Sequence, residues 1–188
     1  MGALRTNSRA ASILGEYLDN FLSTDAEKEI LSPARVVRHL NGEFSREYEG
    51  QGVFLTLFAA FIDLTGNSIC YTTAGHEPPM IVRDDGQVDS LFNTQLVIGI
   101  DTHLKYSERT IPFDRGDTLC FFSDGILDAK NPAGDFYGRQ RLSDVLSELR
   151  GRPSEEIVLG ILQSIREFCS GEPLEDELTI AVASCCKR

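Results

Sequence analysis

The chain has 188 residues, of which 41% are hydrophobic and 25% charged, a composition that predicts one globular domain over residues 1–188 with a buried core. Its formal net charge of −11 argues against nucleic-acid binding, because contact with phosphates requires a basic surface. No apolar run reaches the roughly 20 residues that cross a bilayer, and the N-terminus has no secretory signal, so we expect no membrane insertion.

The five cysteines lie mostly inside apolar runs and show no zinc-binding spacing. Cys185-Cys186 is open to two interpretations, a thiol pair or incidental thiols. Adjacent residues point to opposite faces of a strand, which favours the second. Free thiols fit a reducing compartment, so we expect the protein in the cytoplasm.

Two helices are expected at the beginning of the chain. Apolar residues recur at helical spacing over residues 3–22, where no start signal precedes them. Ser32-Pro33 then forms a good helix start, and Val36, Val37, Leu40 and Phe44 continue on one face.

From Val53 the apolar pattern changes to that of strands joined by short turns. The expected strands are Val53–Leu64, Ser68–Thr73, Met80–Arg83, Gln87–Phe92, Leu96–Ile100, Tyr106–Ile111 and Thr118–Phe122. Helical spacing returns over residues 142–149 and again from Pro153-Ser154, and Leu178–Ser184 closes the chain as a strand. This order predicts an α+β domain in which helices pack over antiparallel sheet.

A carboxylate follows the expected strand Thr118–Phe122, in the sequence Ser123-Asp124-Gly125. An aspartate at the end of a rigid strand is well placed to bind a hard cation, which prefers oxygen ligands on a fixed frame. The alternative is that Asp-Gly only forms the turn that leaves the strand.

Four segments together resemble one protein family: Tyr71-Thr-Thr-Ala-Gly-His-Glu-Pro-Pro-Met80, Leu96-Val-Ile-Gly-Ile100, the stretch from Phe122-Ser-Asp-Gly to Arg141-Leu142, and Glu175-Asp-Glu-Leu-Thr-Ile-Ala-Val182. In this order they resemble the metal-dependent PPM-type serine/threonine phosphatases. The similarity is to the bacterial branch typified by SpoIIE and RsbU, which dephosphorylate anti-sigma-factor antagonists. The resemblance runs from about residue 3 to 185.

The resemblance implies an αββα sandwich with a binuclear Mn²⁺ or Mg²⁺ centre, in which metal-activated water attacks the phosphorus of a phosphoserine or phosphothreonine. By position, Asp124 and Asp176 match metal-binding aspartates of the family. The alternative for Asp176 is a solvated acid in an acidic turn. Candidates for outer neighbours of the metal ligands are Gly125, His76, Asp128 and Glu177; Asp128 also fits a solvent-facing or capping role, and His76 a loop histidine satisfied by hydrogen bonds.

The family carries a further motif, Gly-Asp-x-x-Gly-His-Gly, ahead of its first helix, and its aspartate bridges both metals. No such stretch occurs near the N-terminus here, so the resemblance implies an N-terminally incomplete domain, as a fragment or a shortened relative. Missing strands would leave an exposed sheet edge, which favours homodimer formation.

Three functions follow from these observations. The first is a phosphatase acting on a phosphorylated regulatory protein of the anti-sigma-factor antagonist type. The second is a catalytically inactive relative that binds proteins in the same kind of pathway. The third is an unrelated α+β binding domain whose acidic turns imitate the motifs.

Overall fold

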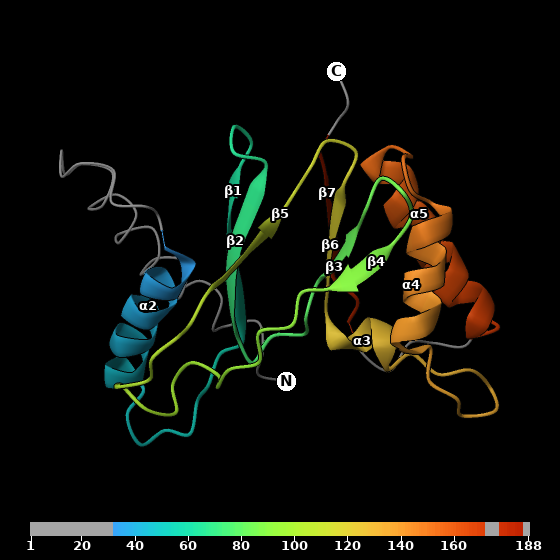
Figure 1. Ribbon diagram of the computed structural model, residues 1–188. Coiled ribbons are helices and arrows are strands. Elements are labelled where there is room, and N and C mark those ends of the chain that lie inside the picture. The colour runs from blue at the N-terminus through green and yellow to red at the C-terminus, as the bar shows by residue number, and fades with distance from the viewer. Residues whose placement is uncertain (1–31, 172–176, 186–188) are drawn as a thin grey trace. The chain divides into compact units, whose positions relative to one another are not determined.

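The computed structural model describes residues 32–171 and 177–185, so the helix expected over residues 3–22 lies outside the described residues. The chain divides into two compact units. The first contains the described residues up to His76 together with Asn93–Pro112, and the second contains Glu77–Phe92 and the described residues from Phe113 onward. Figure 1 shows the elements of both units, which are taken here one at a time.

The first unit begins with helix α2 (Pro33–Glu47), whose start is the one predicted from Ser32-Pro33. The Ser32 side chain accepts a hydrogen bond from the Arg35 N–H at 3.2 Å, which satisfies one of the unpaired donors at a helix start. Val37, Leu40 and Phe44 are buried on one face of α2 and pack in a core that includes Ala74.

The sheet of the first unit contains β1 (Leu57–Asp63), β2 (Ser68–Ala74) and β5 (Arg109–Pro112) in the antiparallel order β1-β2-β5. The predicted hairpin between β1 and β2 is confirmed, with Asp63 paired to Ser68 next to the turn. The Asp63 carboxylate accepts from the N–H groups of Thr65 and Gly66 at 2.8 Å each, so the turn residues find their backbone partners locally.

The strand expected over Leu96–Ile100 does not form; only an isolated bridge joins Ile98 to Leu55. Buried Asn41 of α2 explains the difference, because its side chain binds this segment instead of a strand. It donates to the Asp101 carbonyl at 2.8 Å and accepts from the Gly99 N–H at 3.0 Å. Gly99 has a φ of +100°, which is incompatible with a regular strand.

The second unit contains a four-stranded antiparallel sheet in the order β4-β3-β6-β7. Its strands are β3 (Met80–Val82), β4 (Val88–Ser90), β6 (Thr118–Phe122) and β7 (Ile180–Ser184). Three helices belong to the same unit: the short α3 (Asp124–Leu127), α4 (Gly138–Glu148) and α5 (Ser154–Phe168). Helices α4 and α5 lie over one face of this sheet (Figure 1), and their buried Leu142, Leu146, Ile157, Ile161 and Ile165 share a core with Met80, Val82, Cys120 and Phe122.

The described residues therefore form two antiparallel sheets and four helices, which confirms the α+β class predicted from the sequence. None of the described helices has both the length and the apolar character needed to cross a bilayer.

Candidate metal centre

Strand β6 is the rigid element that carries the candidate metal ligand Asp124. It lies between β3 and β7 and pairs with both, so each edge of the strand is hydrogen-bonded. Leu119 and Cys120 are fully buried, and burial raises the pKa of the Cys120 thiol to about 12. Cys120 is therefore a neutral core residue at physiological pH.

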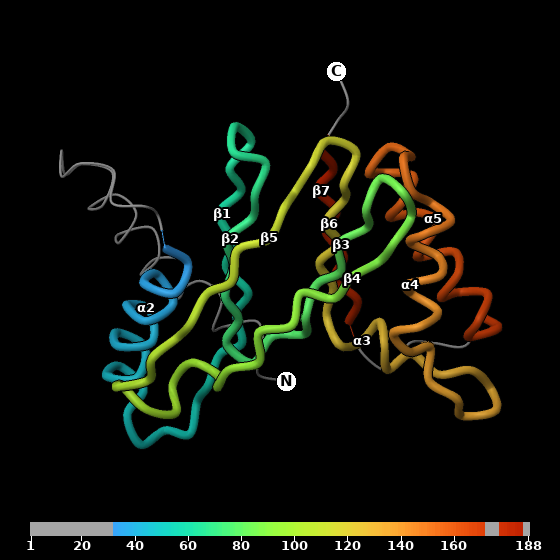
Figure 2. The backbone as a smooth tube through the Cα atoms, in the orientation of Figure 1, coloured from blue at the N-terminus to red at the C-terminus, as the bar shows by residue number. Residues whose placement is uncertain are grey.

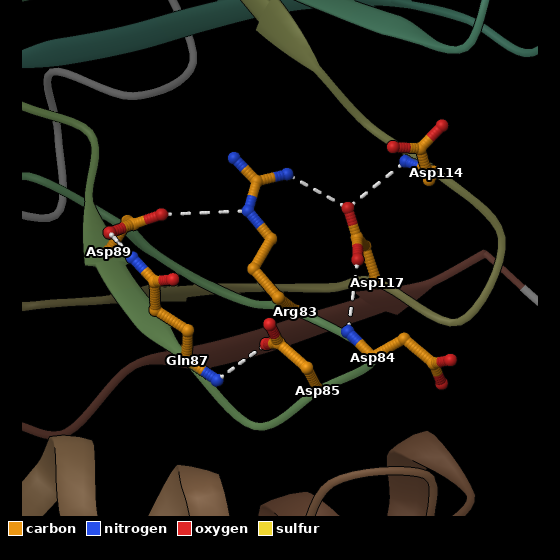
Figure 3. A network of polar contacts seen from close by, with 7 residues as sticks. All are labelled: Arg83, Asp84, Asp85, Gln87, Asp89, Asp114 and Asp117. Carbon is orange, nitrogen blue, oxygen red and sulfur yellow. Dashed lines mark hydrogen bonds and ion pairs between the residues drawn. The ribbon is translucent and has the colours of Figure 1, made fainter.

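The beginning of β6 is fixed by a buried carboxylate network around Asp117 (Figure 3). Asp117 is 3% exposed and accepts from Arg83 Nη1 at 2.8 Å, from the Asp84 N–H at 3.2 Å and from the Asp114 N–H at 3.0 Å. Arg83 also lies 3.5 Å from the carboxylate of Asp89. Because the three donors to the Asp117 carboxylate are two backbone amides and the paired arginine, we assign this network to the structure of the sheet and not to catalysis.

The other end of β6 is joined to the segment that enters β7 through Ser123. The Ser123 N–H donates to the Thr179 carbonyl at 3.0 Å. The Ser123 hydroxyl accepts from the Thr179 N–H at 3.0 Å and donates to the Glu177 carbonyl at 3.2 Å. One serine thus continues the β6–β7 pairing beyond the last paired residues, Phe122 and Ile180.

Asp124 begins α3, where the sequence predicts only a turn, and the backbone runs directly from β6 into this helix (Figure 2). Its side chain is exposed, and Oδ1 accepts from the Gly125 N–H at 3.1 Å. Ile126, in the same short helix, is fully buried in the core of the second unit and anchors α3. An exposed carboxylate therefore stands on a fixed backbone at the end of a buried strand.

The other candidate residues are placed as follows. Asp176 lies outside the described residues, while its neighbour Glu177 is exposed and held to Ser123 through its carbonyl. Asp128 is exposed at the end of α3, where its N–H donates to the Asp124 carbonyl at 3.0 Å. Gly125 is buried and contacts the Asp124 carboxylate, whereas half-buried His76 belongs to the first unit.

No group of three or more His, Cys, Asp or Glu side chains suited to a metal ion occurs in residues 32–171 and 177–185. The metal-ligand roles of Asp124 and Asp176 thus stay predictions. Sequence reasoning overlooked the part that Ser123 plays in joining β6 to the segment before β7, although Ser123 stands in the Ser-Asp-Gly motif.

The chain is similar to several curated proteins over part of their length. It is 31% identical to Protein IcfG of Synechocystis over 121 residues, which are 64% of this chain and 19% of that protein. It is 26% identical to Phosphoserine phosphatase RsbU of Bacillus subtilis over 153 residues, or 81% of this chain and 45% of RsbU. The chain thus spans less than half the length of these relatives.

Three solved structures share the fold at low sequence identity. The SiaA-PP2C domain of Pseudomonas aeruginosa matches 92% of this chain and 68% of that domain, with a TM-score of 0.74 and 18% identity. The catalytic domain of the serine/threonine protein phosphatase PstP, solved with two manganese ions, matches 100% of this chain and 85% of that domain, with a TM-score of 0.66 and 17% identity. The PP2C phosphatase domain of SpoIIE from Bacillus subtilis also shares the fold, with a TM-score of 0.72 and 22% identity over 93% of this chain and 48% of that one. The family model of Stage II sporulation protein E (SpoIIE) matches residues 7–185, so the chain belongs to the SpoIIE family.

Proposed function

We propose that this chain is the phosphatase domain of a bacterial regulatory protein and removes phosphate from a phosphoserine or phosphothreonine on a protein partner of the anti-sigma-factor antagonist type. Membership of the SpoIIE family and the similarity to RsbU, which is named a phosphoserine phosphatase, support this activity and substrate class. We place the reaction in the cytoplasm, since the described cysteines are free thiols.

The observation that carries the proposal is the position of Asp124, exposed at the end of buried β6 while Ser123 joins the same point to Glu177 and Thr179. Glu177 directly follows Asp176, and its carbonyl is bonded to Ser123, which directly precedes Asp124. We propose that Asp124 and Asp176 share one metal-binding edge, with carboxylate oxygens within about 6 Å of each other.

The donor chemistry fits Mn²⁺ or Mg²⁺, because carboxylate oxygens on a fixed frame suit both ions. In this proposal Asp124 and Asp176 hold the ion, Ser123 fixes the backbone that presents them, and the Gly125 N–H orients the Asp124 carboxylate. A bound divalent ion would supply positive charge to the phosphoryl oxygens of the substrate. The chain as a whole, with a net charge of −11, has no excess of positive charge to do so.

The test combines metal binding with turnover. We expect Mn²⁺ to bind the chain, measured from the electron paramagnetic resonance signal of free Mn²⁺, and Asp124→Asn and Asp176→Asn each to weaken binding at least about tenfold. Glu155→Gln, which removes one exposed acid from the first turn of α5 in the same unit, should bind as the unaltered chain does. Equal affinity in Asp124→Asn and Glu155→Gln would contradict the metal assignment.

Turnover separates the enzyme from a binding module of the same fold. A version that carries a Gly-Asp-x-x-Gly-His-Gly hairpin ahead of residue 1 should release phosphate from a phosphoserine protein of the antagonist type when Mn²⁺ is present. Tight binding of that protein without phosphate release would favour the inactive module.

A further inference from the structure

The side chain of Arg139, the second residue of α4, contacts five other residues of the second unit. Its guanidinium forms an ion pair with Glu77, and Nη1 donates to the Pro78 carbonyl and to the Ser90 hydroxyl at 3.0 Å each. Its Cζ lies 5.5 Å from the ring centroid of Phe92 and 5.4 Å from that of Phe122. We call this set the Arg139 clamp: Arg139, Glu77, Pro78, Ser90, Phe92 and Phe122.

The contacts occupy the guanidinium from several directions. Arg139 and Glu77 side chains are 26% and 29% exposed, so their ion pair is partly shielded from water and from salt. The two flanking rings add cation–π attraction, and the planar fork of arginine makes the separate hydrogen bonds at the same time. A lysine could keep the charge at this position but not the whole set of contacts.

The partners of Arg139 come from the two ends of one chain segment and from the end of β6. The chain first enters the second unit at Glu77 and leaves it again after Phe92, so these two residues are the ends of one segment of that unit. Arg139 contacts both ends. The Leu91 N–H donates to the Pro79 carbonyl at 2.8 Å between the same two ends. Phe122 closes β6, two residues before Asp124.

We infer that Arg139 is a positioning residue that holds both ends of the segment Glu77–Phe92 at the end of β6 and thereby fixes the backbone that presents Asp124. The clamp itself follows from the contacts above, and its effect on Asp124 rests on the proposed metal-binding function. Arg139 contacts neither metal nor substrate in this inference.

Hydrogen exchange of backbone amides tests the clamp without any metal or substrate. In Arg139→Ala we expect the Leu91 and Phe92 amides to exchange about tenfold faster or more, the size that follows from losing hydrogen bonds to a charged group. The exchange rates of these amides in Arg139→Lys should lie between those of the unaltered chain and those of Arg139→Ala. Glu77→Gln, which removes only the ion pair, should raise the rates less than Arg139→Ala does. These milder variants keep the test available if Arg139→Ala folds poorly.

Arg141→Ala is the matched control, because it removes the same charge from the same helix. Arg141 donates to the carbonyls of Phe136 and Tyr137 and lies over the Phe168 ring, outside the clamp. It should leave exchange at Leu91 and Phe92 unchanged. Equal exchange at these amides in Arg139→Ala and the unaltered chain would overturn the clamp.

Mn²⁺ affinity tests the second half of the inference. Arg139→Ala should weaken Mn²⁺ binding about threefold to tenfold, and Arg141→Ala should not. Faster exchange with unchanged Mn²⁺ affinity would overturn the positioning of Asp124. Absence of Mn²⁺ binding by the unaltered chain would contradict the proposed function instead, and exchange would still decide the clamp.

Discussion

Gly75 precedes His76 in the loop that leaves β2, and its backbone has a φ of +66°. A Cβ added at this position would lie 2.2 Å from Val97 Cγ1, much closer than van der Waals contact. Gly134 has a similar φ of +86° with no atom within 4 Å of the added Cβ. The pair therefore separates the cost of the backbone conformation from the cost of the collision.

We expect Gly75→Ala to lower the free energy of unfolding by about 2–4 kcal/mol, from an unfavourable left-handed alanine plus overpacking against Val97. Gly134→Ala should lose only the first contribution, about 1 kcal/mol. Urea denaturation of both variants measures the difference. Equal losses would mean that Val97 moves aside at little cost.

Cys120 makes stability depend on pH in the alkaline range. Its pKa rises from 9.0 to about 12 on folding because the thiol is buried in β6. Below pH 9 the thiol is protonated in both states and its contribution is fully present. Between about pH 9 and 12 the unfolded chain loses this proton and the folded chain keeps it, so the stability falls.

We expect this fall to amount to at most about 4 kcal/mol at pH 12, from three pKa units of about 1.4 kcal/mol each. The measurement is the free energy of unfolding in urea from pH 8 to 11, compared between the unaltered chain and Cys120→Ala, whose decline should be shallower. Cys185→Ala controls for the loss of a thiol in a less buried position. A decline of identical steepness in Cys120→Ala would contradict this origin.

At the scale of elements, Ser123 joins β6 to the segment that enters β7. Ser123→Ala removes the hydroxyl acceptor for the Thr179 N–H and the donor to the Glu177 carbonyl. We expect a loss of about 1–2 kcal/mol of stability and, if the proposed metal site is correct, about tenfold weaker Mn²⁺ binding.

Ser147→Ala is its control, since the Ser147 hydroxyl donates a hydrogen bond elsewhere in the second unit, to the Gly86 carbonyl at 2.8 Å. It should lose a similar amount of stability in urea and keep its Mn²⁺ affinity. Equal Mn²⁺ affinities in the two variants would show that the β6–β7 junction does not support the site.

The elements were predictable where one local signal decides the structure. Ser32-Pro33 gave the start of α2, and the turn after Asp63 gave the β1–β2 hairpin. The prediction of a strand over Leu96–Ile100 was wrong because its decisive partner, Asn41, lies far away in the sequence. Asn41 binds backbone groups that a strand would use. Arg139 was missed for the same reason, since its partners Glu77 and Ser90 come together only in the folded unit.

The candidate site was predictable only in part. Asp124 stands in a recognisable motif at the end of a strand, and the structure places it there, exposed. The contribution of Ser123 depends on the register of β6 against β7, which no local pattern specifies.

At the scale of the whole molecule, the charge of −11 predicts the behaviour toward polyanions. We expect the purified chain to pass through a heparin column and to show no binding to duplex DNA at about 0.15 M salt, because it has no excess of cations to displace counterions. Addition of Mn²⁺ should not change this result. Retention on heparin that falls with rising salt would show a local basic surface that the net charge conceals.

The last prediction concerns catalysis by the 188 residues as they stand. The resemblance assigns a third carboxylate, which bridges two metal ions, to a Gly-Asp-x-x-Gly-His-Gly motif that this sequence does not contain near its N-terminus. In the proposed site Asp124 and Asp176 would hold one ion, but two carboxylates do not fix a second ion at the roughly 3.5–4 Å spacing of two-metal hydrolysis. We therefore expect hydrolysis of p-nitrophenyl phosphate with millimolar Mn²⁺ to be about a thousandfold slower, or more, than in a version with that motif ahead of residue 1, since each lost electrostatic contribution raises the barrier by several kcal/mol. Asp124→Asn in the longer version should remove its activity and serves as the control for contaminating phosphatase. Equal, Mn²⁺-dependent turnover by both versions would show that this chain builds its site from other residues than its relatives do.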